Sequence, residues 1–298
     1  MDTALLPEAV DDYLATEQSE LFEFTERLVG FETGNPPGGT VDVVEWLEST
    51  LGDTGLELER VAVDPEKPNL LATLPGESDR TLCFNGHLDT VRFDEGDWSR
   101  DPLGERVGDR IYGRGTTDMK GAVAAMLQVT LAYGRTDTEP PVTLQFAFVS
   151  DEETGGDAGL TTLLETEAFD PDACVVGETT SRAGRYSVSV ADRGNIWLTV
   201  EASGTAAHGS RPMIGDNAID TLTDAVEQLR DDFGQRELPI DAAMDDIIEE
   251  SVAFYEPEAG VEATRRLYRY PTIISGSSRV GRPSTRSRRR RAPVSTSG

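Results

Sequence analysis

The chain has 298 residues, enough for one large domain or two ordinary ones around a substantial buried core. It contains 55 acidic and 27 basic residues, so its formal net charge is −28. This balance disfavours nucleic acid and anionic membranes as partners, and it is typical of a halophile's surface, where salt screens the self-repulsion. We therefore expect most carboxylates to lie on solvated faces.

Hydropathy and cysteine usage predict the compartment. No apolar stretch approaches the roughly 20 residues that span a membrane, and the N-terminus lacks a basic region followed by a hydrophobic core. Cys83 and Cys174 each lie in a short apolar run, "TLCF" and "ACVV". We expect a soluble, cytoplasmic protein whose two thiols are buried and reduced.

The first part of the chain alternates helical and strand patterns. A helix is predicted over 7–32, ended by "TGNPPGG", and a second over 40–53. The strands "LELERVAV", "NLLATLP" and "RTLCFNG" follow, then the helix "DMKGAVAAMLQVTLAYG", the apolar strand "VTLQFAFVS", a helix over 157–167 and the strand "ACVVGE". This alternation predicts an α/β fold with helices on both faces of a mostly parallel sheet.

The pattern changes near Arg185. "RYSVSVADRGNIWLTVEASG" predicts two antiparallel strands, "DNAIDTLTDAVEQLRDDF" a helix capped by Asp216, and "YPTIIS" another strand. We expect a second, α+β module here.

The tail differs from the rest of the chain in composition. Residues 263–298 hold ten arginines and no acid, whereas residues 1–262 hold 17 basic and 55 acidic groups. One interpretation is a disordered basic arm for nucleic acid. The other is that the fold was not built around these residues.

Four segments place an imidazole or a carboxylate where a strand ends. They are "GHLDT" with His87 and Asp89, "GRGTTDMKG" with Asp118, "VSDEETGG" with Asp151, Glu152 and Glu153, and "VVGETT" with Glu178. The carboxyl ends of strands in an open α/β sheet are where ligands bind, so we expect these segments to converge. Carboxylates buried together need a compensating cation, which predicts a metal site.

Neighbouring residues in these segments suggest different tasks. Asp89 could accept the other N–H of His87 and hold the ring in the metal-binding tautomer. Adjacent Glu152 and Glu153 suit a division of labour in which one binds metal and the other takes a proton from water.

The motifs "GHLDTV", "YGRGTTDMKGA", "SDEETGG", "VVGETT" and "GTAAHGSRPMIGDNAI" resemble, in order and spacing, a zinc-dependent metallopeptidase and deacylase family. This family includes aminoacylase, acetylornithine deacetylase, succinyl-diaminopimelate desuccinylase and glutamate carboxypeptidase. The similarity runs from about residue 20 to 275. It implies a zinc-exopeptidase-like catalytic domain over 1–183 and an incomplete α+β, ferredoxin-like lid and dimerisation domain over 184–275, before a disordered Arg-rich tail over 276–298.

The resemblance also assigns roles to residues. It implies that His87 and Glu178 bind one zinc, that Glu153 binds the other, and that Asp118 bridges both and precedes a cis peptide bond. Glu152 would be the general base and Asp89 the residue that orients His87. His208 of the lid would stabilise the oxyanion, commonly in the other subunit of a homodimer. Cobalt or manganese could replace zinc at such ligands.

Part of the family pattern is missing. The family takes a further histidine ligand from a returning C-terminal segment, but no histidine follows His208. Its Asn-x-x-Pro segment and its arginine for the substrate carboxylate are not legible after "YPTIIS". We therefore expect a chain that is truncated, or whose reading frame shifts shortly after Ile274, which the nucleotide sequence would test.

Three functions remain open. The first is a metal-dependent hydrolase that cleaves the amide bond of an N-acyl amino acid or peptide, as a desuccinylase or deacetylase of amino acid biosynthesis or, next, a carboxypeptidase. The second is an inactive or impaired fragment of such an enzyme with at most one well-formed metal site. The third, nucleic-acid binding through "RSRRRR", is opposed by the acidic body of the chain.

Overall fold

The computed structural model describes residues 6–180, 184 and 186–276, so the Arg-rich stretch over 277–298 lies outside the described residues. Contacts divide the chain into two units, Met1–Asp192 and Arg193–Gly298. Among the described helices, none has both the length and the apolar character needed to cross a membrane.

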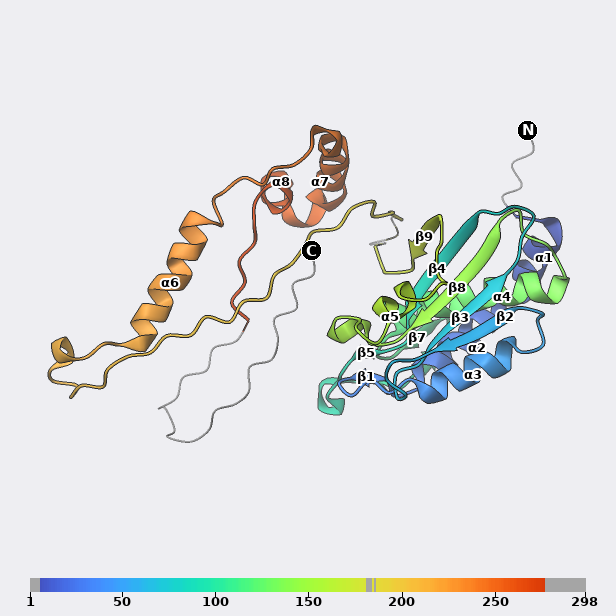
Figure 1. The fold of residues 1–298 in the computed structure, drawn as a ribbon, viewed down its shortest axis with the longest axis horizontal. Helices are drawn as coiled ribbons and strands as arrows, with labels where there is room; N and C mark the ends of the chain where they lie inside the picture. The colour runs from blue at the N-terminus through green and yellow to red at the C-terminus, as the bar shows by residue number, and fades with distance from the viewer. Residues whose placement is uncertain (1–5, 181–183, 185, 277–298) are drawn as a thin grey trace. The chain divides into compact units, whose positions relative to one another are not determined.

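The first unit is built on a five-stranded sheet (Figure 1). Its strands lie in the order β2 (Glu57–Val61), β3 (Asn69–Leu74), β8 (Thr143–Val149), β4 (Thr81–His87) and β9 (Ala173–Val176). β3 is antiparallel to both of its neighbours, whereas β8, β4 and β9 are parallel to one another. Four of the five strands thus point the same way, which confirms the mostly parallel α/β sheet predicted from the sequence.

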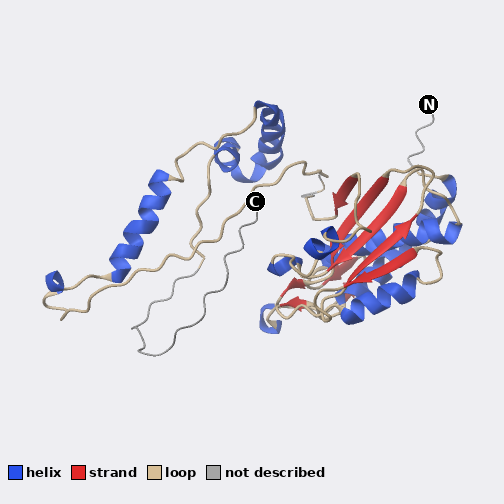
Figure 2. Cartoon of the chain, viewed as in Figure 1, coloured by secondary structure: helices blue, strands red, loops and turns tan. Residues whose placement is uncertain are grey.

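One face of the sheet is covered by four helices, which Figure 2 shows in blue against the red strands. They are α1 (Glu8–Thr16), α2 (Gln18–Val29), α3 (Val41–Leu51) and α4 (Gly121–Thr136). Alternate strand residues such as Leu70, Phe146 and Phe148 point into this core. Phe84 and Phe146, directly opposed on β4 and β8, stack at a centroid distance of 5.4 Å.

The single helix predicted over 7–32 is two helices, because the chain turns at Glu17. The backbone carbonyl of Glu17 accepts a 2.7 Å hydrogen bond from the buried Gln128 amide of α4. This contact with a distant helix satisfies a carbonyl at the break. Sequence periodicity could not reveal it.

The other face of the sheet carries a smaller core. Leu163 of α5 (Leu160–Leu164) and Phe169 pack against Leu71, Cys83, Ala147 and Val149. Cys83 is buried here as predicted, but Cys174 is exposed, so the prediction of two buried thiols is wrong for Cys174. The reason is its place on β9, which ends the described sheet.

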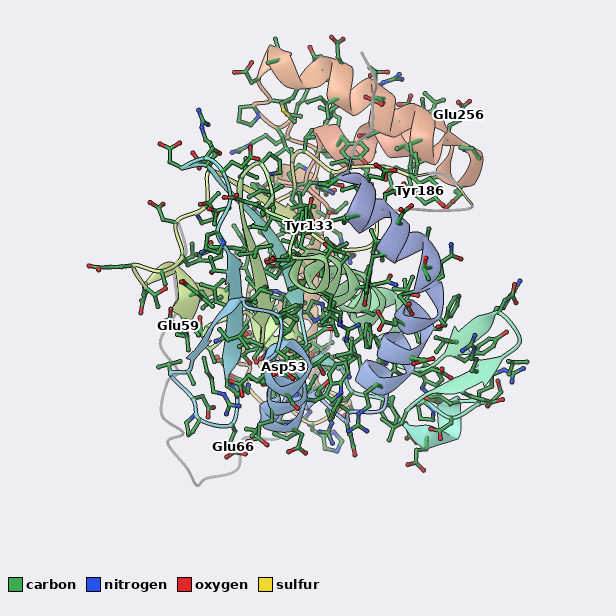
Figure 3. All side chains as sticks on the ribbon, turned by 90° about the vertical axis from the view of Figure 1, so that its right-hand side faces the viewer. Asp53, Glu59, Glu66, Tyr133, Tyr186 and Glu256 are labelled. Atoms are coloured by element: carbon green, nitrogen blue, oxygen red, sulfur yellow. The ribbon has the colours of Figure 1, made fainter. Side chains whose placement is uncertain are left out.

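Short elements complete the first unit. β1 (Gly34–Asn35) pairs in parallel with β5 (Thr90–Val91), and β6 (Glu105–Val107) pairs with β7 (Arg110–Tyr112) as a hairpin. Single helical turns lie at Glu95–Asp97, Thr116–Lys120 and Glu152–Thr154. Figure 3 shows the side chain of Tyr133 within the unit, and those of Asp53, Glu59 and Glu66 are exposed.

The second unit contains α6 (Ala218–Asp232), α7 (Asp245–Ala259) and α8 (Val261–Arg269), with short turns at Pro212–Ile214 and Ala242–Met244. α6 is predicted correctly, but its cap is Asn217, whose side chain accepts from the backbone N–H of Ile219, and not Asp216. The α7–α8 hairpin was not anticipated. Arg265 pairs with Glu249 and Arg269 with Asp245 across it.

The strands predicted for this part of the chain do not form in the described residues of 184–276, where one isolated bridge joins Thr205 and Asp216. The apolar side chains of the expected strands are exposed, among them Val188, Ile196, Trp197 and Leu198. A two-stranded ribbon is marginal unless further strands or a helix cover its apolar face. Local β propensity alone therefore does not make these segments form strands.

Candidate metal centre

His87 ends β4, between the parallel strands β8 and β9, and only 1% of its surface is exposed. Its Nδ1 lies 2.9 Å from the backbone carbonyl oxygen of Asp89, which can only accept, so Nδ1 carries the proton. Nε2 lies 3.0 Å from Asp118 Oδ1 and 3.4 Å from Glu178 Oε1, so the protonated ring donates to these carboxylates, and loss of that proton leaves the Nε2 lone pair for a cation. This tautomer suits metal binding through Nε2.

Asp118 reaches the site from a tight turn before α4. Gly115 starts this turn with φ 86°, and a Cβ there would lie 2.6 Å from the Cγ2 of Thr90. Only glycine combines this backbone conformation with so close an approach. The peptide bond between Asp118 and Met119 is cis, as the resemblance implies.

Glu152 and Glu153 lie in the helical turn that follows β8. Asp89 holds this turn, because its Oδ1 accepts the N–H of Glu152 at 3.1 Å and its Oδ2 accepts the N–H of Glu153 at 3.2 Å. Glu153 Oε1 in turn accepts the N–H of Val91 at 3.0 Å. Asp89 therefore braces the acidic turn in addition to lying beside His87.

The four segments converge as the sequence predicts. His87 forms one possible ligand group with Asp118 and Glu178 and another with Glu152 and Glu153. Within each group the potential ligand atoms lie within 4.8 Å of one another. All of these residues except Asp118 end or follow the adjacent parallel strands β8, β4 and β9, which is the physical reason for the convergence.

Charge crowding perturbs the titration of the site. Burial and the charge of Asp118 raise the pKa of Glu153 above its usual value. Burial, with further contributions from Asp118 and Glu152, also raises the pKa of Glu178. Burial lowers the pKa of His87, but Asp89, Asp118 and Glu178 outweigh it and raise the pKa to about 9. A positive charge is thus favoured at the centre of the cluster.

The residues present fit a divalent cation. One imidazole nitrogen and several carboxylate oxygens are ligands that zinc and similar metals accept, and a cation would relieve the repulsion among the carboxylates. The side chains of Asp118 and Glu178 are 56% and 41% exposed, so the cluster is open to small molecules.

A cleft of about 420 Å³ adjoins the cluster. Its lining includes Asp118 and Glu153 together with Trp98, Tyr112 and Arg114. The guanidinium of Arg114 lies over the ring of Trp98 at 5.4 Å, and its buried Nε makes no hydrogen bond to any described residue. Among the described residues no carboxylate pairs with Arg114, so its charge borders the acidic site without an ion pair there.

His208 belongs to the second unit and is not among the residues that converge on His87. It is exposed, with Nδ1 at 2.8 Å from the hydroxyl of Ser210. Its role toward the oxyanion stays a prediction.

Sequence reasoning missed two residues behind the acidic turn, Asn35 and Lys67. Asn35 hydrogen-bonds to both Asp89 and Asp151, and Lys67 pairs with Asp151. Signals for them existed. Asn35 lies in the "TGNPPGG" turn, and Lys67 is one of two lysines in an otherwise arginine-using chain.

Comparisons with known proteins agree with this geometry. Residues 83–274 match the model of peptidase family M20/M25/M40. An acetylornithine deacetylase from Vibrio campbellii is 36% identical over 198 residues, which are 65% of this chain and 50% of that protein. The chain spans about half the length of the curated relatives it matches.

Solved structures show the same fold. The dipeptidase Dug1p from Saccharomyces cerevisiae has a TM-score of 0.58 at 15% identity, with 91% of this chain and 68% of that chain covered. The metallo-carboxypeptidase Sso-CP2 from Sulfolobus solfataricus, described as an M20 family member, has a TM-score of 0.53 at 19% identity, with 87% and 61% covered.

Proposed function

The chain belongs to peptidase family M20/M25/M40, and from this we propose that it is a metal-dependent hydrolase of the amide bond in N-acyl amino acids or small peptides. One observation carries the proposal. Five chemically suitable side chains from four segments, His87, Asp118, Glu152, Glu153 and Glu178, form two groups that share one buried imidazole.

The proposed ligands of the metal are His87, Asp118, Glu153 and Glu178. Zinc is the first candidate, with cobalt or manganese as alternatives that the same mixture of imidazole and carboxylate permits. When bound, such a cation polarises the scissile carbonyl and makes water more acidic.

Glu152 is the proposed general base and acid. It lies in the same ligand group as His87 and Glu153 but is the more exposed of the two glutamates, so it is free to meet water and substrate. Its carboxylate takes a proton from the attacking water and then gives that proton to the leaving nitrogen of the amide. Asp89 keeps Glu152 in place through the backbone hydrogen bond described above.

The proposed substrate carries a carboxylate. Arg114 supports this, because it lines the cleft beside Asp118 and forms no ion pair with a described residue. The 36% identity to an acetylornithine deacetylase favours N-acetyl amino acids over peptides, and N-succinyl amino acids are the alternative that the family resemblance suggests. A cytoplasmic location, a homodimer, the oxyanion role of His208 and the absence of a nucleic-acid partner stay predictions.

The test is Glu152→Gln in the zinc-loaded chain, assayed on N-acetyl- and N-succinyl-amino acids. We expect kcat to fall by about 10²-fold or more, while the metal content per chain stays that of the parent, because Glu152 moves protons. Metal content is measured by mass spectrometry after dialysis. Glu167→Gln, an exposed glutamate elsewhere in the unit, is the matched control and should leave both quantities unchanged.

Turnover retained in Glu152→Gln would refute the role of Glu152. A parent chain that holds metal without any turnover would instead favour the non-catalytic alternative, and a parent that holds none would refute the metal site itself.

A further inference from the structure

A second polar cluster lies directly behind the acidic turn, and the proposed chemistry does not use it. Asp151 is its centre. This residue is 6% exposed and adopts φ 66°, a left-handed conformation that is uncommon outside glycine and asparagine or aspartate. Its carboxylate takes no part in the two ligand groups, although Glu152 and Glu153 are the next residues along the chain.

Lys67 supplies the positive charge for Asp151. Its Nζ lies 2.5 Å from Asp151 Oδ1, and the lysine side chain is 16% exposed. The loop around Lys67 is fixed on the same segment, since the hydroxyl of Ser150 donates to the carbonyl of Pro68 at 2.6 Å and the Ser150 N–H donates to Asn69 Oδ1 at 2.9 Å. The ammonium therefore has a defined place.

Asn35 connects this cluster to Asp89, the residue that holds the backbone of Glu152 and Glu153. Its Nδ2 lies 2.8 Å from Asp89 Oδ2 and 3.1 Å from Asp151 Oδ1. Because ionised carboxylates only accept, the amide must present its N–H groups to both. The pairing of Gly34–Asn35 with Thr90–Val91 places Asn35 beside the segment that carries Asp89.

Two carboxylates, those of Asp89 and Asp151, thus hold the turn that carries Glu152 and Glu153. Each depends on a hydrogen-bond donor for its own position. Asp89 binds the backbone of Glu152 and Glu153, and Asp151 closes the local turn through the Thr154 hydroxyl at 2.6 Å and the Ala158 N–H at 3.2 Å. Removing Lys67 would leave Asp151 as a buried charge without a counterion. Such a charge relaxes by moving toward water, which would shift the turn that Asp151 closes.

We propose that Lys67 and Asn35 are positioning residues of the metal site. Lys67 acts through Asp151, and Asn35 acts through Asp151 and Asp89, so that together they fix Glu152 and Glu153 relative to His87. The inference rests on the proposed function, because it concerns the same acidic turn.

The experiment compares the parent with Lys67→Met, Lys67→Arg and Asn35→Ala. Cobalt(II) is titrated into each chelator-treated chain, and its visible absorption gives affinity and ligand geometry without any turnover. Zinc-loaded chains are then assayed for kcat and KM separately, and thermal unfolding checks that each variant folds.

We expect Lys67→Met and Asn35→Ala to weaken cobalt binding about 10- to 100-fold and to alter the cobalt spectrum, because residues that orient ligands have effects of this size. kcat should fall more than KM rises, since the cleft lining is untouched. Lys67→Arg should restore part of both quantities. Arg60→Met, which removes an exposed ion pair with Glu48, is the control and should bind cobalt like the parent.

A variant that removes both charges of the pair keeps the proposal testable if Lys67→Met alone does not fold. Lys67→Met combined with Asp151→Asn removes both charges of the pair, so it should bind cobalt more tightly than Lys67→Met alone. Folded Lys67→Met with the cobalt affinity, spectrum and kcat of the parent would overturn the inference while leaving the proposed function intact. A parent that binds no cobalt would contradict both.

Discussion

Two histidines of one chain illustrate how residue identity and position combine. His87 is buried among carboxylates, whereas His208 is exposed beside Ser210. The motif "GHLDT" together with the other motifs of the family resemblance predicted His87 as a ligand, and the structure places it among the expected carboxylates. The sequence did not reveal the contacts of the residues around it, because the hydrogen bonds and the ion pair among Asn35, Lys67 and Asp151 join residues up to 116 positions apart.

Arg114 provides a prediction at the residue scale. Arg114→Met should raise KM for an N-acyl amino acid about tenfold or more, because a charge-assisted hydrogen bond to a carboxylate contributes about 1.5–3 kcal/mol. KM for the corresponding N-acyl amino acid amide, which lacks that charge, should change little. Steady-state kinetics on both substrates provide the measurement.

The matched control is Arg110→Met, an exposed arginine of β7 outside the cleft lining, which should leave both KM values unchanged. An equal loss with the charged and the neutral substrate would contradict recognition of a carboxylate by Arg114.

At the scale of elements, three adjacent parallel strands do most to build the site. β8, β4 and β9 bring Glu152, His87 and Glu178 to one edge of the sheet. The strands were readable because each is a short apolar run before a polar motif. The break at Glu17 was not, since a side chain of α4 satisfies its carbonyl. Neither was the failure of the predicted strands over 186–204, where no described strand pairs with this segment.

The pairing of β4 and β9 leads to a prediction about the thiols. Cys83 and Cys174 are directly opposed, and hydrogen bonding with Cys83 lowers the pKa of the Cys174 thiol to about 7. Hydrogen bonding with Cys174, together with burial, raises the pKa of Cys83. A lowered thiol pKa gives more of the reactive thiolate at neutral pH. Alkylation of the native chain should therefore modify Cys174 first, at a rate that rises through about pH 7.

Peptide mapping by mass spectrometry after a short iodoacetamide pulse measures this directly. Cys174→Ser should remove the fast reaction, and unfolding should expose Cys83 as a second site. Equal labelling of both thiols in the folded chain would show that the burial of Cys83 does not protect it.

At the scale of the whole molecule, charge is the dominant feature. The net charge of −28 includes ten arginines after residue 262, so the preceding part of the chain is more acidic than the total suggests. Repulsion among exposed carboxylates such as Asp53, Glu59 and Glu66 opposes the folded state (Figure 3).

This repulsion predicts stabilisation by salt. The thermal unfolding midpoint should rise between about 0.1 M and about 1 M KCl, over which the Debye length shortens from about 10 Å to about 3 Å. Differential scanning calorimetry provides the measurement, with sorbitol at equal osmolality as the uncharged control. If sorbitol raises the midpoint as much as KCl does, the effect comes from exclusion of the solute from the protein surface and not from charge screening.

The sequence by itself determined the α/β class, the order of the strands along the chain, the family resemblance and which acidic residues converge on His87. These follow from local periodicity and from motifs whose residues lie close together in the chain. Only the tertiary structure decided the partners of Asp151, the break at Glu17, the exposure of Cys174 and the absence of strands over 186–204. Each of these depends on a contact, or a missing contact, between residues far apart in sequence, and hydrophobic patterning carries no information about such pairs.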